Sequence, residues 1–458
     1  MTTDPLSKDL AAIARNVRSG RISATELIRT ASRRHLERGD ELNAYRSWDG
    51  NGAIQLAQRM DCTRAERRGN KPLWGIPISV KDLFGQKEAD TYAGSSKRLP
   101  EKWETEGPFV SAFRQAGAIF VGRTNMVEFA FGAVGANSHW PEPRNLCGMA
   151  VSRLAGGSSS GAGVSLCEGS ALVALGSDTA GSVRIPASVT GTVGFKPSNG
   201  RWSTKGMVPL SPTFDSPGFL TRTVRDAAYV FDAIDPILRR SGTASALCPA
   251  DLRTVTMGRV EQHFWDACDP GIAERVEGAL NELSRVGVQQ VCLEMDGLSE
   301  AYSLFADGGL AASEFREFLG AELPEWSDTL DARVAARLDV GPEYGSLAYH
   351  QRRSRFEALG KSANLSLSRV DVLATPTVPI TAPRSADVKS ATAYHRTNLA
   401  ILRNTCVANL LNFCALTLPV GLDDEGVPVG LQLISPAGND RNLIKIGLAI
   451  EECLSATW

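Results

Sequence analysis

The sequence predicts an α/β fold, with a central sheet covered by helices, and three observations lead to this prediction. Helical and strand-like segments alternate, as at 110–125, where a helix stops near Gly117 and the short strand AIFVG follows. The apolar, β-branched runs at 73–84 and 370–380 have the composition of buried strands. The segment 414–434 has the pattern of two strands joined by a turn.

The first 65 residues are expected to form helices. Ser23 and Glu26 have the spacing of a capping box, and they precede LIRTASRRHLER, whose apolar residues recur at helical spacing. Residues 66–240 carry the first strand-like runs and, between 155 and 200, the highest glycine, serine and threonine content of the chain. Such a stretch allows sharp turns and close approach of a ligand to the backbone, so we expect 66–240 to be the catalytic core.

The second half of the chain changes character twice. Residues 245–365 are charged, helical in period and without glycine clusters, so we predict a mostly helical lobe inserted into the core. Residues 370–458 return to the core, with strands at 370–380 and 414–434 and a closing helix at 441–454. No internal repeat divides the sequence, and we predict a single domain over 1–458.

Composition narrows the range of partners. The chain has 49 Lys and Arg against 51 Asp and Glu, a balance that gives no electrostatic reason to expect nucleic acid or an anionic membrane as partner. The sequence has no run of 18 apolar residues and no signal-like N-terminus, which predicts no membrane span and a cytoplasmic location. Its nine cysteines and five histidines are scattered, so neither a metal site nor another cofactor is expected. A homodimer is compatible with the sequence.

Three segments together indicate a serine nucleophile with a lysine base. They are PISVKD with Lys81, GGSSSG with Ser158, and GSDTAGSVRIP with Ser182. A serine hydroxyl needs a base within hydrogen-bonding reach, and no histidine lies in a motif. A lysine serves as base when burial lowers its pKa from about 10.4 towards neutrality. We predict Ser182 as nucleophile, Lys81 as base and Ser158 as the proton relay between them.

The turn that ends at Ser182 predicts a site for the oxyanion of acyl transfer. Successive backbone amides in a turn of small residues form an anion-binding concavity, and one such donor is worth about 3 kcal/mol to the transition state. Asp178 and Arg184 flank the turn, and we expect them to pair and hold its shape. The expected backbone donors are Thr179, Ala180, Gly181 and Ser182.

The run from Gly156 to Pro186 resembles the glycine- and serine-rich stretch of the amidase signature family. In that family a lysine, a cis-peptide serine and a nucleophilic serine form a Ser–Ser–Lys triad, and the matching positions are Lys81, Ser158 and Ser182. The resemblance covers nearly the whole chain and weakens between about 245 and 365. It implies an α/β/α sandwich with a large mixed sheet covered by helices on both faces. It also implies hydrolysis of a small linear amide through an acyl-enzyme, without metal or cofactor.

The resemblance also indicates a subgroup and a pocket. The segment 200–223, after the nucleophile, resembles that of stand-alone indoleacetamide, arylacetamide and mandelamide hydrolases. The acyl pocket of the family draws on the stretch that here is 126–132, so Ala130 and Phe131 are candidate walls. Phe131 favours an apolar or aromatic acyl group. Cys167, Ser160 and Ala180 depart from the usual pattern, but they are compact and affect the pocket rather than the triad.

Three alternatives remain open. The family also includes the glutaminase subunit of glutamyl-tRNA amidotransferase, which works only with partner chains. Ser159 lies in a GxSxG pattern at 157–161, which in other hydrolases serves a histidine base, although the preceding 149–155 is a poor strand. The loop AGGSSSGAG is similar to a phosphate-binding loop, but no P-loop lysine follows it and no acidic Mg²⁺ pair accompanies it.

Overall fold

The structure is a computed structural model that describes residues 4–147, 152–241, 246–339 and 345–455. Its strands are β1 (Tyr45–Trp48), β2 (Pro77–Lys81), β3 (Ile119–Thr124), β4 (Val173–Asp178), β5 (Val193–Lys196), β6 (Ser216–Thr221), β7 (Thr256–Arg259), β8 (Gln289–Cys292), β9 (Val372–Pro376), β10 (Phe413–Leu422) and β11 (Pro428–Pro436). They form one mixed sheet in the order β1-β3-β2-β4-β6-β5-β10-β11-β9-β7-β8. This large mixed sheet confirms the predicted α/β class.

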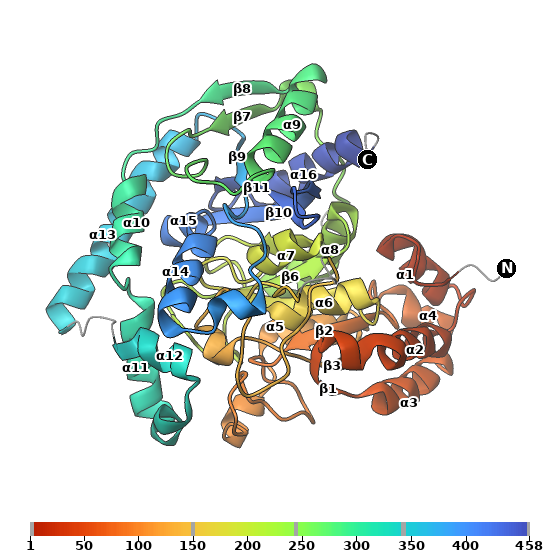
Figure 1. Cartoon of the computed structure of the whole chain (residues 1–458). Coiled ribbons are helices and arrows are strands. Elements are labelled where there is room, and N and C mark those ends of the chain that lie inside the picture. Colours follow the sequence, from red (N-terminus) through yellow and green to blue (C-terminus); the bar gives the residue numbers. More distant parts are fainter. Residues whose placement is uncertain (1–3, 148–151, 242–245, 340–344, 456–458) are drawn as a thin grey trace.

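Helices surround the sheet (Figure 1). The N-terminal helices α1 to α4 lie towards its β1 end, whereas β7, β8 and α9 lie at the opposite end. The α-helices are α1 (Leu10–Arg18), α2 (Ala24–Leu42), α3 (Gly50–Asp61), α4 (Ala65–Gly69), α5 (Pro108–Gln115), α6 (Ser160–Glu168), α7 (Arg184–Thr190), α8 (Val224–Arg239), α9 (Ile272–Arg285), α10 (Leu298–Ala306), α11 (Ala311–Glu322), α12 (Ala332–Asp339), α13 (Ser346–Leu367), α14 (Ala391–Leu402), α15 (Cys406–Leu410) and α16 (Asp440–Ser455).

The central strands are buried on both faces because successive side chains point to opposite sides of a strand. On β4, Val173 and Leu175 belong to an apolar cluster that also contains residues of α8, α9 and α16. Ala174 lies between them and belongs to a different cluster, with Ala162 of α6 and Ala187 of α7. The sheet is therefore the middle layer between two helical layers, as the predicted α/β/α sandwich requires. Burial on both faces explains why these strands read as continuous apolar runs.

The sheet topology brings two strand ends together. Strand β2 runs parallel to β4, with Ile78 opposite Val173 and Val80 opposite Leu175. Parallel neighbours end at the same edge of a sheet. The residue after Val80 is Lys81, and β4 ends at Ser177 and Asp178, so these polar side chains meet beyond the apolar part of both strands.

Three short strands lie in regions that were expected to be helical or mostly helical. Strand β1 falls within the first 65 residues, and β7 and β8 fall within 245–365, together with α9 to α13. Each has four residues, with the sequences YRSW, TMGR and QQVC, and β1 and β8 are the two edge strands. Such short segments show no period-2 alternation, and pairing with a neighbouring strand decides their conformation.

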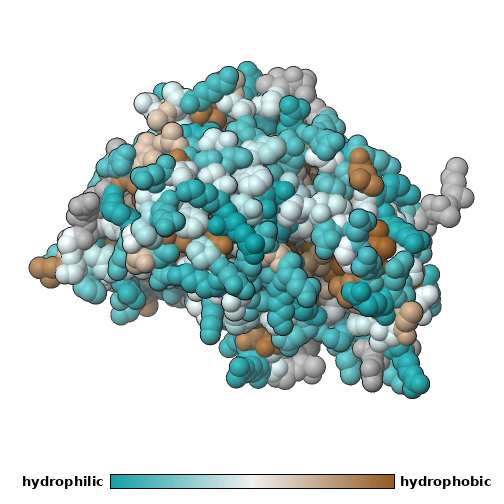
Figure 2. All heavy atoms as spheres, turned by 90° about the horizontal axis from the view of Figure 1, so that it is seen from below, coloured by the Kyte–Doolittle hydropathy of each residue, from teal (hydrophilic) through white to brown (hydrophobic). Residues whose placement is uncertain are grey.

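The face of the molecule seen from below is mostly hydrophilic (Figure 2). Apolar residues appear on it in small, separated groups rather than as one continuous patch. The large apolar side chains that are most exposed in the described residues are spread along the chain; they are Leu36, Val286, Leu347, Leu365 and Leu422. No helix among the described residues is both long and apolar enough to cross a bilayer.

Candidate active site

Lys81 is a fully buried amine at the end of β2. Its Nζ donates hydrogen bonds to Ser158 Oγ at 2.7 Å and to Ser177 Oγ at 2.8 Å. Burial lowers the pKa of Lys81 to about 7, although the carboxylates of Asp178 and Asp215 act in the opposite direction. A substantial fraction of this amine is therefore uncharged near neutral pH, and an uncharged amine accepts a proton.

The two predicted serines lie on adjacent segments. Ser158 follows a cis peptide bond with Gly157 and lies two residues before the start of α6, and its side chain is buried. Ser182 lies in the turn between β4 and α7. The Ser159 amide donates to the carbonyl oxygen of Ser182 at 3.2 Å, which ties the two segments together. In the described part of the chain the hydroxyls of Ser158 and Ser182 are not hydrogen-bonded to each other, whereas Ser182 lines an open cavity.

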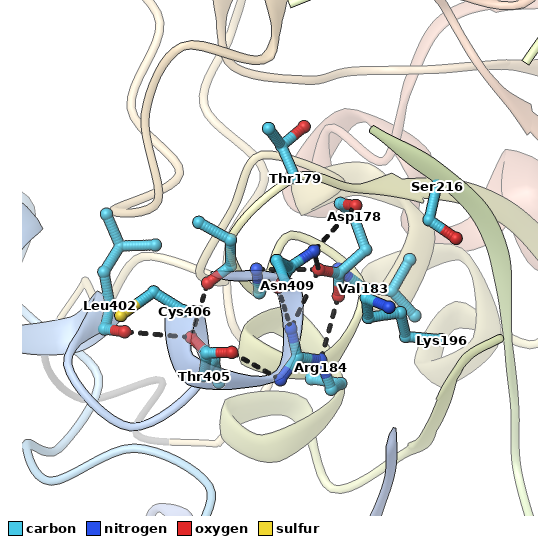
Figure 3. Close-up of polar contacts among 12 residues, drawn as sticks. Asp178, Thr179, Val183, Arg184, Lys196, Ser216, Leu402, Thr405, Cys406 and Asn409 are labelled. Atoms are coloured by element: carbon cyan, nitrogen blue, oxygen red, sulfur yellow. Dashed lines mark hydrogen bonds and ion pairs between the residues drawn. The ribbon is translucent and has the colours of Figure 1, made fainter. Parts of the chain in front are cut away.

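A buried ion pair holds the turn before α7 (Figure 3). Arg184 donates to both carboxylate oxygens of Asp178, at 2.9 and 3.0 Å, and both side chains are fully buried. Burial alone would raise the pKa of Asp178, but the Arg184 charge and its hydrogen bonds hold that pKa at about 2. Arg184 also donates to the Thr405 carbonyl at 2.7 Å and to the side chains of Asn409 and Gln432. The turn is thus fixed by residues more than 200 positions later in the chain.

One of the four expected oxyanion donors is already engaged. The Gly181 amide donates to Asp178 Oδ1 at 2.8 Å, and the Val183 amide donates to Asp178 Oδ2 at 3.2 Å. The strand-end carboxylate therefore accepts from the amide three residues later, and Gly181 does not offer its amide to the cavity as expected. Among the described residues, nothing accepts from the other three expected amides, those of Thr179, Ala180 and Ser182.

The turn also has little room for larger side chains. Gly181 has φ +136°, and a Cβ at this position would lie 2.1 Å from Thr405 Oγ1. The same Thr405 hydroxyl donates to the Ala180 carbonyl at 2.8 Å. On the other side, the Thr179 hydroxyl donates to Asp215 Oδ1 at 2.5 Å, and burial raises the pKa of Asp215 to about 6. Glycine is required at 181 both by backbone conformation and by contact.

Ser182 opens into a cavity of about 440 Å³. Ala130 and Phe131, the two predicted walls, line it together with Thr179 and Ala180. The remaining lining residues were not predicted individually; most of them come from the ends of α10 and α11 and from α12, all within the inserted lobe, and from α14. Besides the residues just named, the lining includes Leu210, Phe214, Phe305, Asp307, Leu310, Arg337, His395, Leu399 and Leu402.

The GxSxG alternative lacks a base in the described structure. The Ser159 hydroxyl is buried and donates to the Ser177 carbonyl at 3.4 Å, and no described histidine contacts it. His35 contacts Glu168, His139 contacts Glu128, and His263 contacts the Arg403 carbonyl. Part of the segment 149–155, which was expected not to form a strand, lies outside the described residues. No cluster of three or more His, Cys, Asp or Glu side chains suited to a metal occurs among the residues described.

The comparison with protein families agrees with this geometry. A family model described as Amidase matches residues 26–444. This chain belongs to the amidase family. The recognition made from the Gly156–Pro186 run is thereby confirmed.

Individual members of the amidase family resemble the chain along nearly its whole length. A 2-amino-5-chloromuconic acid deaminase from Comamonas testosteroni is 43% identical over 442 residues, which are 96% of this chain and 95% of that protein. One component of the glutamyl-tRNA(Gln) amidotransferase of Akkermansia muciniphila is 32% identical and covers 91% of this chain and 93% of its own.

Solved amidase structures have the same fold. The crystal structure of an amidase superposes with a TM-score of 0.85 at 31% identity, covering 98% of this chain and 100% of its own. The native peptide amidase of Stenotrophomonas maltophilia superposes with a TM-score of 0.82 at 25% identity, covering 98% and 97%. With these relatives, the chain is an amide-hydrolysing enzyme of the amidase family.

Proposed function

We propose that the protein hydrolyses a carboxamide to a carboxylic acid and ammonia or an amine, through an acyl-enzyme on Ser182. The single observation that carries this proposal is the buried Lys81 amine, hydrogen-bonded at 2.7 Å to Ser158 and with a pKa of about 7. A lysine with an ordinary pKa near 10.4 would be charged at neutral pH and could not take a proton. Burial behind the apolar part of β2 is what makes this lysine a base.

The acylation step moves one proton along the relay. Ser182 Oγ attacks the amide carbon while its proton passes to Ser158 Oγ, and the proton of Ser158 passes to Lys81 Nζ. The carbonyl π bond becomes an oxyanion, which the amides of Thr179, Ala180 and Ser182 stabilise. Lys81 then returns the proton through Ser158 to the departing nitrogen, and the C–N bond breaks. This leaves an ester on Ser182 and ammonia or an amine.

Deacylation repeats the same steps with water. Water attacks the ester carbon and gives its proton, through Ser158, to Lys81. The second tetrahedral intermediate collapses, the Ser182 oxygen leaves with the returned proton, and the acid is released. Ser177 donates no proton in this scheme. Its hydroxyl, 2.8 Å from Nζ, orients the amine towards Ser158.

The test uses the purified chain alone, screened against simple primary amides with detection of ammonia. We expect turnover by the chain alone and none by Ser182→Ala. Incubation with a fluorophosphonate should add one phosphonyl group to the wild type, and peptide mass spectrometry should place it on Ser182. Labelling at Ser159 instead would contradict the assignment. Activity seen only with added partner chains would favour a role within an amidotransferase complex, the alternative to which the 32% identical relative points.

A second candidate function is hydrolytic deamination of a small amino-substituted acid, because a relative named for that activity is 43% identical over nearly the whole chain. In such a reaction an enamine becomes an imine, water adds across its C=N bond, and ammonia leaves to give a C=O group. The Lys81–Ser158 pair would move the protons. Supplying 2-aminomuconic acid separates the candidates, since deamination converts it to an oxo acid and ammonia, whereas an amidase leaves it unchanged because it contains no amide bond.

A further inference from the structure

A guanidinium that has no carboxylate partner among the described residues lines the cavity that contains Ser182. Arg337 lies on α12 near its C-terminal end and is partly buried. Its Nη1 donates to the Phe131 carbonyl at 2.7 Å, and its Cζ lies 4.0 Å from the centre of the Phe131 ring. These contacts hold the guanidinium against the wall that the sequence predicted for the acyl group. They leave most of its N–H donors unused, because a guanidinium has five.

The surroundings do not neutralise this charge. One turn earlier on α12, Arg333 has the ordinary arrangement, in a bidentate pair with Asp331. Arg337 has no ion pair within the residues described, although Asp307 lines the same cavity. Burial lowers the pKa of Arg337 to about 10, as expected for a cation that has lost water and gained no anion. Removing a charge from water without a partner is unfavourable, so such a group indicates a missing anion.

His395, from α14, also lines the cavity. Burial lowers its pKa, and the nearby Arg337 charge lowers it further. Tyr394, also on α14, is buried and has a pKa raised to about 12, so it adds no negative charge. Two nitrogen-bearing side chains from different helices therefore face one cavity, and both would be stabilised by an anion between them.

We propose that Arg337, with His395 as a second donor, binds a carboxylate on the substrate, so that the enzyme selects amides of small dicarboxylic acids. The inference rests on the proposed function for the position of the scissile bond, at Ser182. A single carboxylate matches one guanidinium in charge and in bidentate geometry. The cavity volume of about 440 Å³ and its apolar side chains, such as Leu399 and Leu402, suit a short carbon chain between the amide and the carboxylate.

The first experiment compares matched substrates. Succinamic, glutaramic and adipamic acids each have a neutral counterpart in which an isopropyl group replaces the carboxylate. For the wild type we expect kcat/KM for the best acid to exceed that for its counterpart by at least tenfold, mainly through a lower KM. In Arg337→Gln the acid should lose roughly 10- to 100-fold more in kcat/KM than the neutral amide does, the usual size of a charged hydrogen bond.

Two variants control for charge and size. Arg337→Lys keeps the charge but loses the planar fork, and we expect an intermediate loss for the acid only. Arg396→Gln removes an exposed charge from the same helix as His395 and does not line the cavity, so it should match the wild type on both substrates. Retained turnover of the neutral amide shows that Arg337→Gln is folded. Equal losses on acid and neutral amide, or no preference in the wild type, would overturn the inference.

A binding measurement separates this inference from the amidase proposal. Calorimetric titration of the Ser182→Ala variant with succinate, glutarate and adipate needs no turnover. We expect binding that weakens at least tenfold when Arg337→Gln is added. If no amide is hydrolysed but this loss is seen, the hydrolase proposal fails and the carboxylate site stands. If amides are hydrolysed but none of these acids binds, the carboxylate site is wrong.

Discussion

The turn at 178–184 and the cavity wall around Arg337 each contain a guanidinium group, but the two groups differ in how many of their donors are used by the protein. Arg184 is fully buried and reaches a carboxylate, a backbone carbonyl and two side-chain amides. Arg337 is only partly buried, and it donates to the backbone carbonyl of Phe131. The first arginine is satisfied by the protein and fixes a shape, whereas the second has donors left for a ligand.

The difference shows how this fold divides its tasks. Asp178 and Arg184, which brace the turn that contains Ser182, are already paired, so the nucleophile turn keeps its geometry in the absence of substrate. Another part of the cavity wall comes from α12 and α14, and the Arg337 charge on it has no ion-pair partner among the described residues. The turn at 178–184, whose ion pair is complete, therefore carries the chemistry. The cavity wall with Arg337, which has donors left for a ligand, selects the substrate.

The largest effect is expected at Lys81. Lys81→Met keeps the length of the side chain and removes the base, and kcat should fall roughly 10³-fold or more. The melting temperature should not fall, because an apolar chain needs no compensation in this buried site. Stopped assays of ammonia release and thermal melts measure the two quantities. A variant that retains a tenth of the wild-type kcat would show that another group acts as base.

The next largest effect is on stability. Asp178→Asn leaves Arg184 buried without its counter-charge and should lower the free energy of unfolding by about 3–5 kcal/mol. The matched control is Arg225→Gln, which breaks the exposed pair with Glu452 and should cost less than about 1 kcal/mol. Urea denaturation of both variants gives the comparison. Equal costs would mean that the turn is not the rigid region described above.

The pH dependence should be smaller and specific in sign. Lys81 has a pKa of about 7 and acts uncharged, so kcat/KM should reach a plateau above pH 7 and fall about tenfold for each unit below it. Asp215, with a pKa raised to about 6 by burial, becomes protonated over the lower part of this range; the loss of its negative charge lowers the pKa of Lys81 and makes the fall less steep there. A rate profile that stays flat down to pH 5 would contradict the uncharged lysine.

The smallest effects are expected from the histidines outside the cavity. His35→Ala, His263→Ala and His350→Ala should each keep kcat within about threefold of the wild type, since none of them lines the cavity with Ser182. Turnover is measured well below the melting temperature, so that a loss of packing does not count as a loss of chemistry. A hundredfold drop in kcat for any of these variants would support a histidine as the catalytic base.

The sequence predicted best where one segment carries its own signal. The strands β2 and β9 fall within the predicted runs, and β10, β11 and α16 match theirs to within two residues, because long apolar or periodic stretches decide their own conformation. The candidate triad was readable for the same reason, since each member lies in a distinctive local motif. Strands β1, β7 and β8 could not be predicted from the sequence, because a segment of four residues of mixed polarity forms a strand only by pairing with its neighbours.

The parts of the site that were missed depend on contacts between distant segments. Ser177 lies within the GSDTAGS run, and its contact with Lys81 follows from the parallel pairing of β2 and β4, which no local pattern reveals. Arg337 occurs in the ordinary amphipathic helix ARVAARLD. Nothing in that segment distinguishes Arg337 from Arg333, four residues earlier. Only in the folded chain does Arg333 pair with Asp331 while Arg337 lines the cavity.

The links from Arg184 to Thr405, Asn409 and Gln432 also bear on biosynthesis. During translation the nucleophile emerges well before the segments that brace its turn. A nascent polypeptide that stops short of residue 405 contains Lys81, Ser158 and Ser182. It lacks the residues that hold the turn at 178–184 through Arg184. Hydrolytic competence therefore arrives late in synthesis, once the carboxy-terminal quarter has docked.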